Sequence, residues 1–183
     1  MAETYKVAVL AGDGIGPEIT QQALRVLRLI EQKRDVVFAC DEVEFGAAAY
    51  FSTGKAFPDA TKKACDEADA ILKGPIGLSH EESEKIPVEE RPERGALLPM
   101  RRRLNTYANF RPISLPKGMA HFSPLKPEIV SEGIDIMLIR ELIGGLYFGS
   151  KERGETKEGL RYVKESLDYD EQQIRQILVV AFK

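Results

Sequence analysis

The sequence predicts an α/β protein in which a parallel or mixed sheet is flanked by helices, and three features support this fold class. Short β-branched runs alternate with amphipathic stretches at helical spacing, which is the pattern of strand–helix–strand units. Glycine and proline clusters separate these runs, most densely at residues 12–17. The composition, 43% hydrophobic and 30% charged, is that of an ordinary globular protein.

The first hundred residues predict three strands with helices between them. Residues 5–10 read as a strand, and a helix should begin near Pro17, because proline suits the first helical position. The glutamate-rich stretch 81–90 reads as a solvated loop. The other expected elements are a strand over 36–43, short helices over 46–51 and 58–68, and a strand over 69–72.

The remaining residues predict a different arrangement. A helix from Gly95 to about Leu104 precedes strands over 107–115 and 134–141, and residues 144–149 are too glycine-rich for a core strand. Further expected elements are an exposed or intersubunit strand over 161–168 and an amphipathic helix over 170–183. We expect two incomplete domains, 1–100 and 101–183. The last helix has no glycine or proline stop, so we expect a truncated chain with exposed apolar surface.

Charge and cysteine content exclude several classes of protein. The net charge of −3 argues against a general nucleic-acid binder. No stretch reaches the roughly 20 apolar residues of a membrane span, and the first residues lack signal-peptide features, so we expect a cytoplasmic protein without a membrane partner. Cys40 and Cys65 are expected to be reduced thiols in or near the core.

Two patterns point to ligand binding. Gly12, Gly14 and Gly16 do not follow the G-x-G-x-x-G spacing, because Pro17 stands where the third glycine should be. Their turn could hold an anion with its free amides or could simply close tightly. Three arginines lie where predicted elements end or emerge, and guanidinium groups converging in one cleft would suit a small dicarboxylic acid: Arg101, Arg111 and Arg140.

Five motifs occur in order along the chain: V-A-V-L-A-G-D-G-I-G-P-E, P-E-R-G-A-L-L-P-M-R-R-R-L, Y-A-N-F-R-P, S-P-L-K-P-E-I-V and I-R-E-L-I-G-G-L-Y-F-G. Together they resemble the 3-isopropylmalate dehydrogenases among the β-decarboxylating dehydrogenases. The resemblance covers essentially the whole chain and implies that family's fold, with a dimerisation arm at about residues 142–168.

The resemblance implies an activity and roles for particular residues. The expected reaction is NAD-dependent oxidative decarboxylation of (2R,3S)-3-isopropylmalate to 4-methyl-2-oxopentanoate in leucine biosynthesis. The three arginines would bind the two carboxylates of the malate moiety, and Tyr147 would protonate the enolate carbon after carbon dioxide leaves. Leu97 and Leu98 would form the apolar pocket for the isopropyl group.

The same resemblance implies cofactors and a partner. The residues expected along the nicotinamide half of NAD are Gly77, His80 and Glu93. Family members also use Mg²⁺ or Mn²⁺ and a catalytic lysine, whose positions lie downstream of Lys183, so no metal site is expected in this chain. Because a lysine and a metal-binding aspartate come from the neighbouring subunit, the family relationship implies a homodimer.

Two departures from the family pattern keep alternatives open. Ile143 replaces a common threonine, and residues 73–77, Lys-Gly-Pro-Ile-Gly, differ from the common leucine-glycine-alanine-valine-glycine form. A related tartrate, D-malate or homoisocitrate dehydrogenase is therefore one alternative. A non-catalytic truncated fragment is the other.

Overall fold

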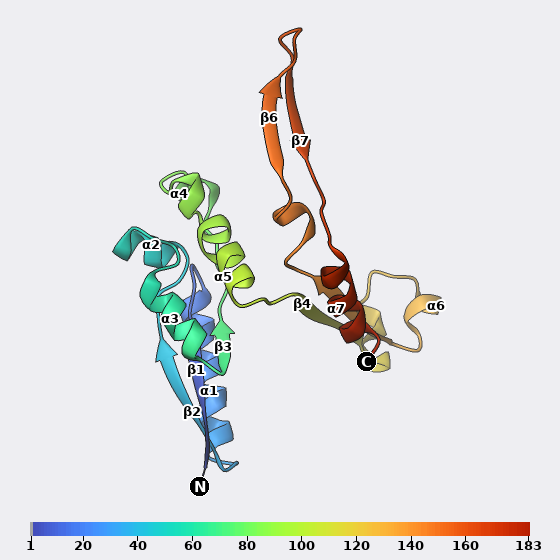
Figure 1. Cartoon of the computed structure of the whole chain (residues 1–183). Helices are drawn as coiled ribbons and strands as arrows, with labels where there is room; N and C mark the ends of the chain where they lie inside the picture. The colour runs from blue at the N-terminus through green and yellow to red at the C-terminus, as the bar shows by residue number, and fades with distance from the viewer. Residues whose placement is uncertain (1) are drawn as a thin grey trace. The chain divides into compact units, whose positions relative to one another are not determined.

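The computed structural model describes residues 2–183, which divide into two compact units, one that ends at Leu104 and one of Asn105–Lys183 (Figure 1). The division falls after Leu104 rather than at the predicted residue 100. Helix α5 (Leu98–Arg103) continues past that point, and Arg103 near its end is hydrogen-bonded to Asp66 in the first unit.

The first unit contains a three-stranded parallel sheet with strand order β2-β1-β3. Its strands are β1 (Glu3–Leu10), β2 (Val36–Glu42) and β3 (Ala70–Lys73). Helix α1 (Gly16–Glu31) connects β1 to β2, and α2 (Ala47–Thr53) and α3 (Asp59–Glu67) connect β2 to β3. Successive strands thus lie on opposite sides of β1, which creates a topological switch point, the usual place for a ligand in such sheets. The predicted α/β class is confirmed.

Different side chains fill the space on the two faces of this sheet. Val9 packs with Leu24 of α1 on one face. Leu10 packs with Phe45 and Cys65 in a larger cluster on the other. Alternation of buried residues along β1 therefore holds helices on both faces, as the alternating sequence predicted.

The two cysteines lie in different environments. Cys65 is buried, as expected, and burial raises the pKa of its thiol. Cys40 is exposed, so its predicted location in or near the core is wrong. The reason is that β2 is an edge strand whose second half is exposed to solvent.

The segment predicted as a solvated loop contains short helical turns. They are α4 (His80–Ser83) and η1 (Val88–Glu90), and the π-helical η2 (Pro92–Leu97) follows them and runs into α5. Ser79 and Glu82 form a capping box at the start of α4, and the Glu90 carboxylate accepts a hydrogen bond from the Ala56 N–H at 2.8 Å. Two acids of the stretch 81–90 thus have structural roles that the loop interpretation missed.

The second unit is built on an antiparallel pair, β4 (Ala108–Leu115) and β5 (Ile134–Glu141), which matches the two strands predicted there. Between them lie η3 (Lys117–Phe122) and α6 (Pro127–Val130). The turn η4 (Gly145–Tyr147) then leads to an unpredicted strand, β6 (Lys151–Glu155), which pairs with β7 (Arg161–Glu165). Helix α7 (Glu171–Ala181) follows with Asp170 as its N-cap, as predicted.

Several large apolar side chains are exposed, which confirms the expected exposure of apolar surface. Val26 and Leu29 of α1 are more than half exposed, and Leu178 and Val179 of α7 are about half exposed. Among the helices of residues 2–183, none combines the length and the apolarity that a bilayer crossing needs.

Candidate functional site

The turn after β1 is centred on a buried carboxylate, Asp13, which is only 6% exposed. Its Oδ1 accepts the N–H of Ala48 in the first turn of α2, and its Oδ2 accepts the N–H of Gly77, both at 3.0 Å. The Asp13 N–H donates to the carbonyl of Pro75 at 2.9 Å. One residue thus ties together the segments that follow β1, β2 and β3.

Glycine allows the backbones at this switch point to touch. A Cβ added at Gly12, whose φ is +78°, would lie 2.0 Å from the Pro75 carbonyl oxygen, and one at Gly74 would lie 2.1 Å from that of Ala11. The space is therefore filled by protein, and the nearby amide of Gly77 is already bound to Asp13. Of the two readings of the glycine turn, the structure favours the tight turn over an anion-binding loop.

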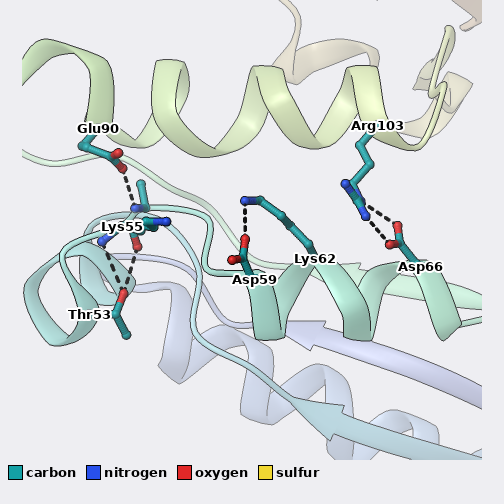
Figure 2. A network of polar contacts seen from close by, with 8 residues as sticks. Thr53, Lys55, Asp59, Lys62, Asp66, Glu90 and Arg103 are labelled. Atoms are coloured by element: carbon teal, nitrogen blue, oxygen red, sulfur yellow. Dashed lines mark hydrogen bonds and ion pairs between the residues drawn. The ribbon is translucent and has the colours of Figure 1, made fainter.

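A polar network fixes the end of α5 against α3 (Figure 2). Arg103 donates from Nε to the Asp66 Oδ1 at 2.8 Å and from a terminal nitrogen to the other carboxylate oxygen. This guanidinium holds the pKa of the Asp66 carboxyl below its usual value. Arg101 lies about 200° from Arg103 around the helix, so the two arginines leave α5 in different directions.

Lys73, at the carboxyl end of β3, places a second cation near Arg101. Its ammonium donates to the Gly74 carbonyl at 2.7 Å, and the side chain is half-buried. Burial lowers the pKa of Lys73, the charge of Arg101 lowers it further, and Asp13 raises it. This part of the first unit therefore has an excess of positive charge suited to an acidic ligand.

The residues predicted to contact NAD are accessible at the surface of the first unit. Gly77 has a φ of +131° and an open Cα, since a Cβ there would meet nothing within 4 Å. His80 is exposed in α4, with its Nδ1 3.7 Å from an oxygen of Glu84, and Glu93 is exposed in η2. All three can be reached by a ligand, although the Gly77 amide is already used by Asp13.

The two leucines predicted for the substrate pocket have different surroundings. Both are half-buried, but Leu97 packs against the core cluster that contains Leu10 and Phe57. Leu98 begins α5 and is not a member of that cluster. Leu98 is therefore the better candidate for contact with an apolar ligand group.

In the second unit, Arg111 and Arg140 lie on the same face of the β4–β5 pair. Arg140 is directly opposite Asn109, and residues two apart on a strand share a face. Arg111 also donates from Nε to the Asn109 Oδ1 at 2.8 Å. Two guanidinium groups and an amide are thereby presented together, an arrangement that can bind a carboxylate.

Tyr147 lies beside this group. The guanidinium carbon of Arg140 is 5.6 Å from the centre of the Tyr147 ring, within the range of a cation–π contact. The structure thus brings Arg111, Arg140 and Tyr147 into one region, whereas Arg101 belongs to the first unit. The phenol can donate a proton to a ligand bound at the arginines.

Three further residues shape these sites and were not singled out from the sequence. Asp13 could have been noticed as an acid inside a glycine turn, where backbone amides gather. Glu141 accepts the amides of Ile143 and Gly144, two and three residues further on, so an acid just before a glycine turn is a local signal of the same kind. Tyr169 carries no local signal, because it packs on glycines more than twenty positions earlier in the chain. Within residues 2–183, no group of three or more His, Cys, Asp or Glu side chains could hold a metal ion.

Known proteins with similar sequences are longer than this chain. The 3-isopropylmalate dehydrogenase of Campylobacter jejuni is 40% identical over 181 residues, which cover 99% of this chain and 49% of that protein. The enzyme of the same name from Geobacter sulfurreducens is 43% identical over 183 residues, 100% of this chain and 50% of that protein. The chain therefore spans about half the length of the curated relatives it matches.

A solved structure also resembles this one. The isocitrate dehydrogenase from Methylococcus capsulatus superimposes with a TM-score of 0.75 at 26% identity, covering 97% of this chain and 46% of that one. Residues 6–183 match the sequence family described as isocitrate/isopropylmalate dehydrogenase. With nearly the whole chain matched and the fold shared, this protein belongs to the isocitrate/isopropylmalate dehydrogenase family.

Proposed function

We propose that this chain takes part in the NAD-dependent oxidative decarboxylation of (2R,3S)-3-isopropylmalate to 4-methyl-2-oxopentanoate, a step of leucine biosynthesis. The observation that carries the proposal is the grouping of Arg111, Arg140 and Tyr147 at one end of the β4–β5 pair. The names of the relatives support the choice of substrate.

In this proposal the arginines bind and orient the substrate. Arg111 and Arg140, together with Arg101, hold the two carboxylates of the malate moiety through charge-assisted hydrogen bonds. Tyr147 then acts as the acid: its O–H bond breaks as the proton moves to the carbon that has lost carbon dioxide. Leu98, with Leu97, contacts the isopropyl group, and such an apolar contact selects by about 1–3 kcal/mol per methylene.

NAD and a divalent cation complete the proposal. When bound, NAD would supply the hydride acceptor, and Mg²⁺ or Mn²⁺ would supply positive charge that stabilises an enolate. The nicotinamide half is proposed to lie along the segment that contains Gly77, His80 and Glu93, all of which a ligand can reach. We place the ligands of the divalent cation downstream of Lys183, as the resemblance to the 3-isopropylmalate dehydrogenases implies.

We further propose that the enzyme is a cytoplasmic homodimer that uses the β6–β7 hairpin as its arm. Every residue of β7 is exposed, including Val163 at 61%, and the hairpin has two open edges. Val163→Asp should therefore weaken the dimer, as measured by analytical ultracentrifugation, without lowering the helix content. A dimer of unchanged affinity would exclude the hairpin face around Val163 from the interface.

A dehydrogenase of a more polar 3-substituted malate is the second candidate. The observation in its favour is the half-buried ammonium of Lys73 close to Arg101, which could bind a further carboxylate or hydroxyl group. Tartrate and homoisocitrate carry such a group and D-malate does not, so these three are the substrates to compare. Lys73→Leu should leave turnover of 3-isopropylmalate within a few-fold under the first proposal, and should abolish the preference for a polar substrate under the second.

The decisive assay is NADH formation from 3-isopropylmalate with Mg²⁺, run together with intact-mass measurement of the native protein. Arg140→Lys and Arg111→Lys should raise KM about 10- to 100-fold, because each loses a bidentate contact worth about 1.5–3 kcal/mol. Tyr147→Phe should lower kcat about 100-fold or more. Arg175→Lys, on the exposed side of α7, is the matched control. The proposal would be refuted if only the control lost activity, or if Arg140→Lys, Arg111→Lys and Tyr147→Phe all kept wild-type activity.

A further inference from the structure

The turn that carries Tyr147 is held from its amino side by the carboxylate of Glu141, the last residue of β5. The Glu141 Oε1 accepts the N–H of Ile143 at 2.8 Å, and Oε2 accepts the N–H of Gly144 at 3.0 Å. Hydrogen bonds from two successive amides to one half-buried carboxylate are charge-assisted and set the direction in which the chain leaves the strand.

The same turn is held from its other side by the segment just before α7. The Gly145 N–H donates to the carbonyl of Asp168 at 2.9 Å. The ring of Tyr169 lies directly against both glycines: a Cβ at Gly144 would be 2.7 Å from the ring, and one at Gly145, whose φ is +65°, would be 2.4 Å from the hydroxyl oxygen. The glycine pair is thus required by the ring that packs on it.

The base of the β6–β7 hairpin adds a third restraint. The Ser150 N–H donates to the Ser166 Oγ at 2.7 Å, and the Ser166 N–H donates to the Ser150 carbonyl at 3.0 Å. A Cβ at Gly149 would lie 2.0 Å from the Ser166 carbonyl oxygen. The chain on both sides of Tyr147 is therefore fixed to residues that follow the hairpin.

We propose that Glu141 and Tyr169 are positioning residues that hold the Gly144–Tyr147 turn so that the Tyr147 phenol stays beside Arg140. This inference rests on the proposed role of Tyr147 as the acid. Neither residue needs to touch the substrate, since both act through the backbone of the turn. A displacement of the phenol by about 1 Å is enough to cost a large factor in rate.

The test uses the complete protein, with the carboxyl-terminal half that the relatives possess, and the steady-state assay with 3-isopropylmalate, NAD and Mg²⁺. Tyr169→Ala should lower kcat about 10- to 100-fold with KM changed less than about 3-fold. Because protonation by a misplaced phenol becomes the slow step, the solvent deuterium isotope effect on kcat should rise. Tyr169→Phe keeps the ring against both glycines and should restore kcat to within about 3-fold.

Glu141→Gln supplies a second variant that keeps the side chain's size but only one oxygen acceptor for the two amides. It should show the same fall in kcat and the same rise in isotope effect, and it decides the matter if Tyr169→Ala does not fold. Phe122→Ala and Glu132→Gln, at exposed positions of the same unit, are matched controls that should keep wild-type kinetics.

Tyr147→Phe distinguishes failure of the proposed role of Tyr147 from failure of the positioning inference. If this variant keeps full kcat, the proposed role of Tyr147 fails and the positioning inference fails with it. If Tyr147→Phe is inactive while folded Tyr169→Ala and Glu141→Gln keep kcat and isotope effect, only the positioning inference is overturned.

Discussion

Replacing Asp13 by asparagine tests how far the first unit depends on one buried carboxylate. In the wild type each carboxylate oxygen accepts a backbone N–H, from Ala48 and from Gly77. Asparagine has a single acceptor oxygen and would direct an NH₂ group at the other N–H. A buried donor left without a partner costs about 1–3 kcal/mol, and the remaining bond loses its charge-assisted part, about 1 kcal/mol more.

We therefore expect Asp13→Asn to lower the free energy of unfolding by about 2–4 kcal/mol, and Asp13→Ala by somewhat more, since it leaves both donors unmatched. Urea unfolding followed by circular dichroism measures the loss. Amide hydrogen exchange shows where it arises: protection should fall first at Ala48 and Gly77. Asp35→Asn, an exposed acid on the turn before β2, should change stability by less than about 0.5 kcal/mol.

The outcome that would refute this reasoning is equal stability of the Asp13→Asn and Asp35→Asn variants together with unchanged exchange at the two amides. In that case the close contact between the backbones at the switch point, and not the carboxylate, would hold the segments together. Since that contact depends on Gly12 and Gly74, Gly12→Ala would then be the more damaging change, because its Cβ meets the Pro75 carbonyl.

Two further predictions concern pH. The folded-state pKa of Lys73 lies below its unfolded value, so the native state binds fewer protons between the two and stability rises with pH in that window. Lys73→Met should therefore stabilise the chain at pH 7, by an amount that shrinks toward about pH 10, and an equal difference in Tm at both values would contradict this. The pKa of Asp66 is lowered by Arg103, so its contribution is present above the ordinary aspartate pKa and is lost as pH falls through the folded value. Asp66→Asn should lower the urea midpoint at pH 7 and much less at about pH 3; the same decrease at both would exclude the ion pair as its cause.

Strongly patterned elements were predictable from the sequence. Strand β1 and helix α1 follow from an apolar run, a glycine turn and a proline in the first turn of the helix, all of which are local signals. Helix α7 follows from Asp170 and an apolar repeat, and its capping box with Gln173 is present. Strand β6 could not be predicted in the same way, because its residues are mostly charged and it exists only through pairing with β7.

The ligand-binding residues of the candidate site were predictable from the sequence, but the residues that hold them in place were not predicted. Arg111, Arg140 and Tyr147 were identified from motifs, and the structure places them in one region. Two residues that hold them there were missed. Glu141 acts on amides two and three positions further on, which is a local pattern, whereas Tyr169 acts on glycines more than twenty positions earlier in the chain. Long-range packing such as that of Tyr169 leaves no periodic signal in a single sequence.

The grouping of the two arginines depends on the register of β4 against β5. Side chains alternate between the faces of a strand, so a shift of pairing by one residue would move Arg111 to the face opposite Arg140. The observed register runs from Ala108 opposite Glu141 to Leu115 opposite Ile134, and beyond its end the Leu142 N–H donates to the Tyr107 carbonyl at 2.9 Å. An insertion or deletion of one residue within either strand would thus separate the guanidinium groups while leaving both arginines in the sequence. The carboxylate site is therefore a property of the strand pairing as much as of the arginines themselves.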